Sequence, residues 1–313
     1  MDRPKLVIIT GPTGVGKSYL GHRLAGEMGG EILNADSMQV YRYMDVGTAK
    51  PTLLERKEVP YHLIDIIDPD QPFDASEFRL RAHSVIQGLH LRRVPILLIG
   101  GTGLYLRVLQ RGIFSCPKPT IEIRQRWRKA ASEHGPEFLW EEVRKNDLLA
   151  AGRIHPRDTF RLIRALEVLE LTGRPISEWQ QWGHEAEPDF EILWIGLSME
   201  REVLYRNINL RTEAMMNRGF LDEVQGLLEK GYAPELKSMQ SLGYRHLVEA
   251  IKGIRNLKVT VDLIKRDTRR YAKRQLTWLA KEENLTWYSP QEFDKIRLNI
   301  LKFLKQTENH DHP

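Results

Sequence analysis

One short segment near the start of the chain constrains its fold more than any other. Residues 11–18 read Gly-Pro-Thr-Gly-Val-Gly-Lys-Ser, which matches the phosphate-binding loop G-x-x-x-x-G-K-[ST] at every fixed position. The segment follows an apolar run, residues 6–10, and precedes a stretch with helical spacing, residues 17–28. The motif requires this order of strand, loop and helix. The sequence therefore predicts an α/β core that begins with a phosphate loop.

The loop predicts a site for a diphosphate group. Its glycines let backbone amides approach phosphate oxygens, and the following helix N-terminus adds the positive end of its dipole. We expect Lys17 to reach the outer phosphoryl oxygens and Ser18 to ligate Mg²⁺, the predicted cofactor. The loop recognises phosphates and not a nucleotide as such. The predicted diphosphate-binding residues of the loop are Gly11, Pro12, Thr13, Gly14, Val15, Gly16, Lys17 and Ser18.

Further apolar runs predict a parallel sheet. Residues 31–35 and 95–99 read as buried strands, a helix is expected over residues 76–91, and residues 192–197 read as a strand that returns to the sheet. Strands that alternate with helices favour a parallel α/β sheet. We predict a P-loop NTPase-like core, in which a parallel sheet is flanked by helices.

The middle of the chain has a different pattern. Helical stretches predominate between residues 113 and 191, with turn signals at Gly135-Pro136, His155-Pro156 and Gly173. We interpret this region as a mainly helical insertion domain. The expected division is residues 1–112 for the first part of the core, 113–191 for the insertion, and 192–313 for the rest of the core with basic C-terminal helices.

Two polar residues follow predicted strands. Asp36 ends the second strand, and Thr102 comes after the strand at residues 95–99 and two glycines. Open α/β sheets bind their ligands just beyond the carboxyl ends of the strands, so both residues are candidates for the site. Asp36 could be a magnesium-associated carboxylate, as in a kinase. Either residue could instead cap a helix, since both precede sequences that can start one.

The charge distribution suggests a polyanionic partner. The whole chain carries +5, but residues 255–281 hold nine Lys and Arg against two Asp, an excess of seven positive charges. The rest of the chain is therefore at −2. Clustered Lys and Arg are the groups that contact nucleic-acid phosphates, and the alternative is a solvated helix face.

Composition and hydropathy exclude several classes of protein. The chain has no run of 18 apolar residues, and it enters its first predicted strand too soon to leave room for a signal peptide. The single cysteine, Cys116, excludes an internal disulfide and a cysteine-based zinc site. We expect a cytoplasmic protein without membrane contact that acts as a monomer, with a frayed end over its last eight residues.

Six segments carry a resemblance that spans most of the chain. The most particular are Asn-Ala-Asp-Ser-Met-Gln-Val-Tyr and Thr-Arg-Arg-Tyr-Ala-Lys-Arg-Gln, whereas many enzymes share the phosphate loop. Together they resemble the tRNA dimethylallyltransferase family, also called isopentenyl-diphosphate:tRNA transferases. The sequence carries no C-terminal zinc-finger extension, which favours the bacterial type. The six segments are residues 11–18, 34–41, 44–51, 100–105, 240–245 and 268–275.

The resemblance implies a specific reaction. In this family the phosphate loop holds dimethylallyl diphosphate instead of ATP, and the dimethylallyl group is transferred to the exocyclic amine of the adenosine next to the anticodon. Diphosphate is released. By matching motifs, Asp36 resembles the general base, Thr102 a donor to the diphosphate near the breaking bond, and Arg211 an arginine that contacts the diphosphate.

The resemblance also implies a tRNA-binding surface. Its helical part is the stretch at residues 160–164, in which Phe160 stands where many relatives carry a polar residue. Arg153, Arg157, Arg161 and Arg164 follow one another there at helical spacing, which an ordinary amphipathic helix would also produce. The implied tRNA contacts are Asp36, Ser37, Met38, Gln39, Thr102, Arg124, Arg161, Arg164, Gln240, Ser241, Leu242, Gly243, Tyr244 and Arg245.

Three other functions remain possible from the residues alone. A small-molecule kinase would bind ATP in the same loop, but it would leave the basic segment at residues 255–281 unexplained. A prenyltransferase acting on free AMP would use the same core without need of the helical insertion. An RNA-binding module that is not an enzyme has no need of a phosphate loop together with Asp36 and Thr102.

Overall fold

The computed structural model describes residues 3–112, 120–182 and 189–305. The chain forms two compact units, one made of Met1–Gln110 with Asp189–Pro313 and the other of Arg111–Pro188. The predicted start of the insertion at residue 113, Cys116 and the predicted frayed end after residue 305 lie outside the described residues.

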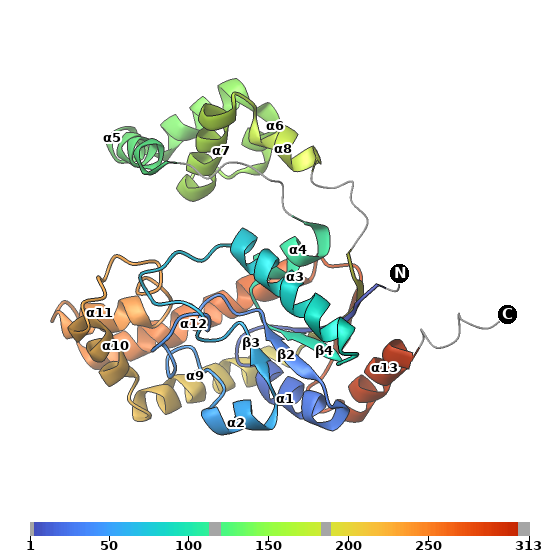
Figure 1. Ribbon diagram of the computed structural model, residues 1–313. Helices are drawn as coiled ribbons and strands as arrows, with labels where there is room; N and C mark the ends of the chain where they lie inside the picture. The colour runs from blue at the N-terminus through green and yellow to red at the C-terminus, as the bar shows by residue number, and fades with distance from the viewer. Residues whose placement is uncertain (1–2, 113–119, 183–188, 306–313) are drawn as a thin grey trace. The chain divides into compact units, whose positions relative to one another are not determined.

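The first unit is built on a six-stranded sheet in which every pairing is parallel (Figure 1). The strand order is β3-β2-β4-β1-β5-β6, which confirms the predicted parallel α/β sheet. The strands are β1 (Lys5–Thr10), β2 (Glu31–Asn34), β3 (Tyr61–His62), β4 (Ile96–Ile99), β5 (Glu191–Leu197) and β6 (Leu285–Tyr288).

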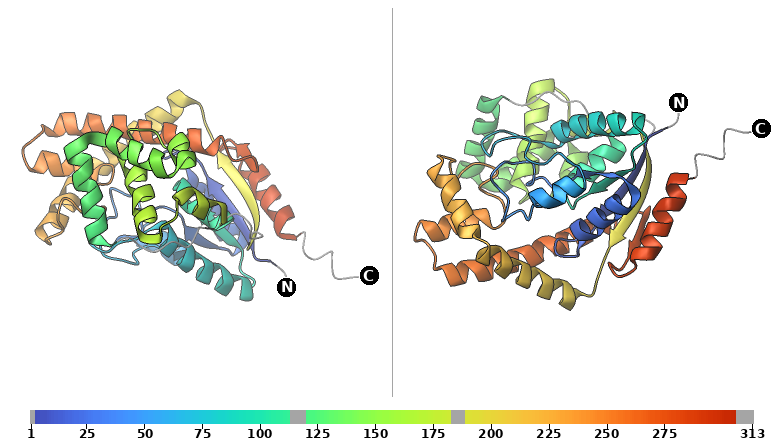
Figure 2. Two further views of the ribbon diagram at one scale, coloured as in Figure 1. Left: turned by 90° about the horizontal axis from the view of Figure 1, so that it is seen from above. Right: turned by 60° about the horizontal axis from the view of Figure 1, so that its bottom comes forward.

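Helices cover both faces of this sheet. In β1, Leu6 and Ile8 belong to one apolar cluster and Val7 and Ile9 to another, so successive side chains enter cores on opposite faces. This explains why β1 is a continuous apolar run, since a strand buried on both faces has no solvent side. The helices α3 and α4 pack on the first face, and α1 and α13 on the second (Figures 1 and 2).

The helices of the first unit begin and end at residues suited to those positions. Asp74 accepts hydrogen bonds from the amides of Ser76 and Glu77 and so caps α3, and Gly29, with φ 60°, ends α1. The helices are α1 (Lys17–Met28), α2 (Leu53–Glu58), α3 (Ala75–Leu91), α4 (Gly103–Arg111), α9 (Arg201–Asn217), α10 (Phe220–Glu229), α11 (Tyr244–Ile251), α12 (Leu257–Leu279) and α13 (Phe293–Lys305).

The described part of the second unit is helical, with its own apolar core. The helices are α5 (Ile121–Asn146), α6 (Leu148–Arg153), α7 (Thr159–Thr172) and α8 (Ile176–Trp182). Gly135 takes φ 81° within α5, so the helix breaks at the predicted turn Gly135-Pro136, and α7 ends at Gly173. Leu139, Leu162 and Leu166 are buried together in this core.

Within the described residues, no helix has both the length and the apolar composition needed to cross a membrane.

Candidate active site

The sheet order brings the predicted site residues of the first unit to one edge. Strands β2, β4 and β1 are neighbours, and their carboxyl ends lead into Asp36, Thr102 and the phosphate loop. Parallel strands all end on the same side, so three segments far apart in the sequence converge there.

The phosphate loop connects β1 to α1 in a conformation that needs glycine. Gly11 and Gly14 have φ of 149° and 84°. A Cβ atom at Gly11 would lie 2.6 Å from the carbonyl oxygen of Leu197, and one at Gly14 would lie 2.8 Å from Cγ1 of Ile208. The loop therefore fits tightly against its surroundings. It presents the first turn of α1, whose amides have no partner within the helix and attract anions.

Lys17 lies over this loop. Its Nζ atom donates hydrogen bonds to the carbonyl oxygens of Gly11 at 2.9 Å and Pro12 at 2.8 Å. The pKa of Lys17 is lowered to about 7, mainly by burial and also by the positive charge of Arg211, while the charge of Asp36 opposes the shift. An anion bound in the loop would favour the charged ammonium.

Arg211 reaches the same place from α9. Its Nη1 atom lies 3.4 Å from Oγ1 of Thr13 in the phosphate loop. Burial lowers the pKa of Arg211, and the Asp36 carboxylate opposes the shift. Two partly buried cations and one carboxylate thus share this part of the site, which carries a net positive charge when all three are ionised.

Asp36 caps a turn and not a helix. Its Oδ1 atom accepts a hydrogen bond from the amide of Met38 at 2.8 Å, and its own amide donates to Oδ1 of Asn34 at 3.1 Å. Residues 37–40 are not helical, so the alternative of a helix N-cap does not apply to Asp36. Thr102 lies beside it, with Oγ1 accepting a hydrogen bond from the amide of Ser37 at 3.1 Å.

Two cavities meet at these charged groups. The smaller one, of about 80 Å³, has mainly polar residues in its wall, among them Lys17, Ser18 and Gln275, and is called the polar cavity below. The larger one, of about 280 Å³, is mostly apolar. Its apolar wall includes Ile208, Met215, Phe220, Leu242 and Ile264. The walls of both cavities share Thr13, Asp36, Arg211 and Tyr271.

Tyr271, on α12, is the shared residue to which the sequence assigned no role. Its pKa is raised to about 12, mainly by burial and also by the negative charge of Asp36. The hydroxyl therefore keeps its proton at neutral pH. A hollow of about 620 Å³ elsewhere, lined by Leu221, Leu228 and Ile251 among others, contains none of the predicted site residues.

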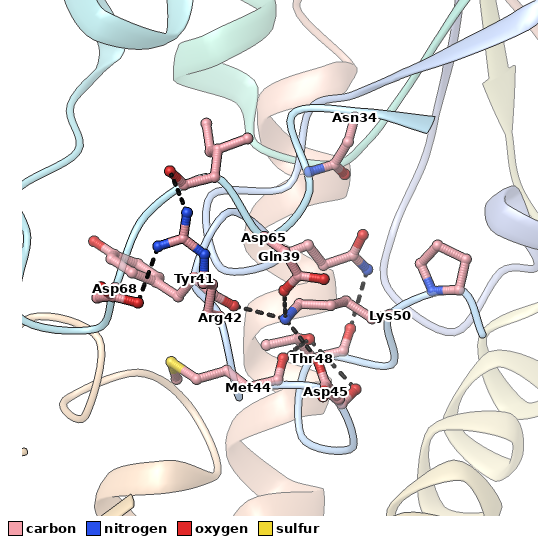
Figure 3. A network of polar contacts seen from close by, with 12 residues as sticks. Asn34, Gln39, Tyr41, Arg42, Met44, Asp45, Thr48, Lys50, Asp65 and Asp68 are labelled. Carbon is pink, nitrogen blue, oxygen red and sulfur yellow. Dashed lines mark hydrogen bonds and ion pairs between the residues drawn. The ribbon is translucent and has the colours of Figure 1, made fainter. Parts of the chain in front are cut away.

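A buried lysine fixes the loop that forms one wall of the larger cavity. The side chain of Lys50 is 1% exposed, and its Nζ atom donates to Oδ1 of Asp45 at 2.6 Å, Oδ1 of Asp65 at 2.5 Å and the Tyr41 carbonyl at 2.6 Å (Figure 3). The side-chain amide of Gln39 donates to the Thr48 carbonyl at 3.1 Å in the same network. Gln39 is thus buried against protein carbonyls.

Glu223 holds the same loop from the other side. Its carboxylate accepts hydrogen bonds from the amides of Asp45, Val46 and Gly47 at 2.6–3.0 Å, and from the hydroxyl of Tyr244 at 2.6 Å. Burial and the nearby Glu223 charge raise the pKa of Tyr244. The sequence did not identify Lys50 or Glu223 individually, although residues 44–51 belong to a matched segment.

The predicted tRNA contacts of the first unit are only partly brought together. Ser37 and Met38 line the larger cavity beside Asp36, and so do residues 241–244. Gln240 and Arg245 are exposed, and Arg245 pairs with Asp267 at 3.5 Å. Thr102 lines neither cavity.

In the second unit, the predicted arginines are paired with carboxylates. Arg124 and Arg164 contact Glu167 at 2.7 and 3.5 Å, and the Glu167 side chain is 1% exposed. Arg161 lies 3.4 Å from Asp158 at the start of α7 and is 69% exposed. The neighbouring Phe160 is 81% exposed, on the side of α7 away from its core.

The basic helix α12 has two kinds of cation. Arg269 donates to Asn209 at 2.6 Å, and Lys265 pairs with Glu213 at 2.6 Å, both on α9. Arg270, Lys273 and Arg274 are exposed, although Arg270 also lies 3.4 Å from Oδ1 of Asp267. Only part of the basic segment therefore faces solvent.

The chain is similar to known proteins over nearly its whole length. Residues 39–282 match the family model described as IPP transferase. A tRNA dimethylallyltransferase of Syntrophobacter fumaroxidans is 50% identical over 96% of this chain and 88% of its own, and tRNA dimethylallyltransferase 2 of Syntrophus aciditrophicus is 46% identical over 97% and 98%.

Solved structures agree with the sequence comparison. The crystal structure of a tRNA isopentenylpyrophosphate transferase from Bacillus halodurans matches with a TM-score of 0.73 and 36% identity, covering 99% of this chain and 100% of that one. A eukaryotic dimethylallyltransferase acting on tRNA matches with a TM-score of 0.79 and 26% identity, over 95% of this chain and 77% of its own.

Proposed function

The chain belongs to the IPP transferase family and is a prenyltransferase of tRNA modification, and we propose that dimethylallyl diphosphate is its prenyl donor. The group is transferred to the exocyclic amine of the adenosine next to the anticodon, and diphosphate leaves. The observation that carries this proposal is the meeting of a polar and an apolar cavity at Asp36 and Arg211. The polar cavity suits a diphosphate, and the apolar one suits a prenyl group or a base.

The leaving diphosphate is stabilised by fixed donors. It gains negative charge as its bond to the allylic carbon breaks, and cations and N–H groups already in place around it lower the barrier. In this chain those groups are Lys17, Arg211 and the amides at the start of α1. Lys17 exchanges its bonds to the loop carbonyls for phosphate oxygens and binds as the charged ammonium.

Mg²⁺ fits the loop as a cofactor held mainly by the substrate. The described residues contain no group of three His, Cys, Asp or Glu that could hold a metal, and Mg²⁺ commonly retains waters and binds phosphate oxygens with one or two protein ligands. The exposed hydroxyl of Ser18 in the wall of the polar cavity is suited to be such a ligand. When bound, the ion neutralises charge on the diphosphate.

Asp36 acts as the general base. An adenine amine is a weak nucleophile, and a carboxylate within hydrogen-bond reach accepts its proton as the new bond forms. Asp36 lies in the wall of both cavities and therefore between donor and acceptor. Met38 holds one of its oxygens through a backbone amide, which fixes the orientation of the carboxylate. Thr102 supports this arrangement through the Ser37 amide.

The acceptor is a loop adenosine that leaves its stack. An unpaired base costs less to extrude than a paired one, so an anticodon loop suits this chemistry. We assign tRNA binding in the first unit to Ser37, Met38, Gln39 and residues 240–245, with phosphate contacts from exposed α12 cations. In the second unit we assign it to Arg124, Arg161 and Arg164. Because tRNA is the substrate, we infer a cytoplasmic enzyme, and we propose that it acts as a monomer.

The acceptor test separates this function from its rivals. Dimethylallyl diphosphate labelled in the prenyl group is incubated with unmodified tRNA, with AMP, or with neither. We expect label only in tRNA, and none in a matched tRNA whose adenosine next to the anticodon is replaced by guanosine. Label in AMP would instead identify an adenylate prenyltransferase. Turnover of ATP without prenyl transfer would identify a kinase.

A further inference from the structure

One residue of α12 holds both loops of the polar cavity. Gln275 is 8% exposed, and its Oε1 atom accepts a hydrogen bond from the amide of Thr13 at 2.8 Å. Its Nε2 atom donates to the carbonyl oxygen of Gly101 at 2.9 Å. A glutamine can make both bonds because it carries one acceptor and one donor at the end of the same side chain.

This contact occupies one end of the phosphate loop. The Thr13 amide donates to Gln275, and the Thr13 hydroxyl lies beside Arg211. The amide of Val15 is also used, since it donates to the Pro12 carbonyl at 3.4 Å. At the other end of the loop, Gly16 and Ser18 are exposed at the start of α1. The loop is therefore open toward α1 and closed at Thr13.

The closure is tight. A Cβ atom at Gly101 would lie 2.3 Å from Nε2 of Gln275, so this turn must be glycine for the side chain to fit. The polar cavity has a volume of about 80 Å³, well below the roughly 300–1,000 Å³ of usual ligand pockets. If Gln275 moved away, the partly buried Thr13 amide and Gly101 carbonyl would both lose their hydrogen bonds, which is unfavourable.

We propose that Gln275 is a specificity-determining residue that limits the phosphate loop to diphosphates and excludes triphosphates. In enzymes that use ATP, the amides and the lysine of this loop cradle successive phosphates of the nucleotide. Here the amide of Thr13 is already bound, and Arg211 and Gln275 stand beside it. Two phosphates fit between the start of α1 and this barrier, and a third phosphate meets Gln275.

This inference rests on the proposed use of the loop for a diphosphate, but its test does not depend on prenyl transfer. Binding of inorganic diphosphate and inorganic triphosphate is measured by calorimetry with Mg²⁺ and without tRNA. The full chain is compared with Gln275→Ala and with the milder Gln275→Asn, whose shorter side chain cannot reach both loops. Thr277→Ala is the matched control, since Thr277 is exposed on the same helix and bonds only to the Lys273 carbonyl.

We expect the natural chain to bind diphosphate more tightly than triphosphate. The dissociation constant for triphosphate divided by that for diphosphate should fall about tenfold in Gln275→Ala. This is the effect of one hydrogen bond that the freed Thr13 amide can donate to the anion. Gln275→Asn should shift the ratio in the same direction by less, and Thr277→Ala should leave it unchanged.

Two results would overturn the inference while the proposed function stands. The first is that the natural chain binds triphosphate as tightly as diphosphate. The second is that the ratio of the two dissociation constants is unchanged in a Gln275 variant whose cooperative thermal unfolding shows that it is folded. Failure of the natural chain to bind either anion would instead count against the proposed use of the loop.

Discussion

The two units of this chain place their charged residues in opposite ways. In the first unit, Lys17, Asp36 and Arg211 come from three separate segments and meet in the wall of the polar cavity. In the second unit, Arg124 and Arg164 lie on the surfaces of helices and pair with one buried carboxylate, Glu167. The first arrangement concentrates charge where a ligand can bind. The second uses much of its charge to hold helices together.

The difference lies in what fixes each side chain. The ends of neighbouring parallel strands must meet at one edge, so a polar residue after such a strand has a defined place and little room for a purely structural role. An arginine on an amphipathic helix can serve packing, solvation or phosphate binding, and its spacing is the same in each case. Mutations of the site residues in the first unit should therefore lower the rate of prenyl transfer. In the second unit, some mutations should lower stability and others should lower tRNA affinity.

The largest effect is expected at Asp36. Asp36→Asn keeps the size of the side chain and its hydrogen bond from Met38, but it cannot accept the amine proton. Single-turnover transfer should fall on the order of 10²–10⁴-fold, with tRNA affinity little changed. If Asp36 instead held the metal, raising Mg²⁺ would recover part of the rate. A rate close to that of the natural chain would refute the assignment as base.

Lys17 should show the next largest effect. Lys17→Ala removes the mobile cation from the leaving diphosphate, and transfer should fall on the order of 10²–10³-fold. A loss of only a few fold would mean that Arg211 and the loop amides suffice without Lys17. Ser18→Ala is a useful comparison, because it tests the metal ligand while leaving the lysine in place.

The lowered pKa of Lys17 predicts that the protein takes up a proton when it binds diphosphate. In the ligand-free protein the pKa of Lys17 is about 7, against 10.5 for an unperturbed lysine. Between pH 7 and 10.5, Lys17 is protonated in the unfolded chain and neutral in the folded one. Its contribution to the free energy of unfolding therefore increases as pH rises through this range. A bound diphosphate favours the charged form. Calorimetry at pH 8.5 in buffers of different ionisation enthalpy should detect uptake of about one proton, which Lys17→Ala should abolish.

Variants of α12 test whether its exposed cations contribute more to tRNA binding than those that bond to α9. Replacing Arg270, Lys273 and Arg274 with Gln should make tRNA affinity less dependent on salt. The slope of the logarithm of the association constant against the logarithm of salt concentration should become less steep by about two to three. Arg269→Gln is the matched control, because Arg269 bonds to Asn209 on α9 and should change the slope little. Equal slopes in the natural chain and the triple variant would mean that the exposed face does not contact RNA.

The smallest effects separate two roles in the second unit. Glu167→Ala leaves Arg124 and Arg164 without their shared partner, and unfolding free energy should fall by about 1–3 kcal/mol because both arginines stay partly exposed. Arg161→Ala should change stability by less than about 0.5 kcal/mol but weaken tRNA binding and lower its salt slope by about one. Denaturant unfolding and a binding titration on both variants check this, and the opposite pattern would reverse the two roles.

The sequence predicted the central strands of the fold but not those at its edges. Strands β1, β2, β4 and β5 are apolar runs because each is covered on both faces. Strands β3 and β6 lie at the two ends of the sheet, and both are partly exposed, with polar residues such as His62 and Thr286. Without a long apolar run, they could not be distinguished from loops.

The candidate site shows a similar limit. Residues after strands, such as Asp36 and Thr102, could be placed because topology fixes where strands end. Gln275 could not, because it stands in a basic helix and its burial depends on how α12 packs over the phosphate loop. Lys50 likewise bonds to the backbone of its own irregular loop at Tyr41, and Glu223 to the backbone of the same loop at Asp45, far away in the sequence. No residue spacing in the sequence predicts such contacts.

The central claim is that the phosphate loop holds a leaving group and does not present a phosphoryl donor. The most direct measurement follows both halves of dimethylallyl diphosphate in one reaction, with one isotope in the prenyl group and another in the terminal phosphate. With unmodified tRNA, we predict that the prenyl label enters RNA and that the phosphate label is released as inorganic diphosphate in equal amount. Phosphate label bound to RNA, or prenyl transfer without an equal release of diphosphate, would contradict this account.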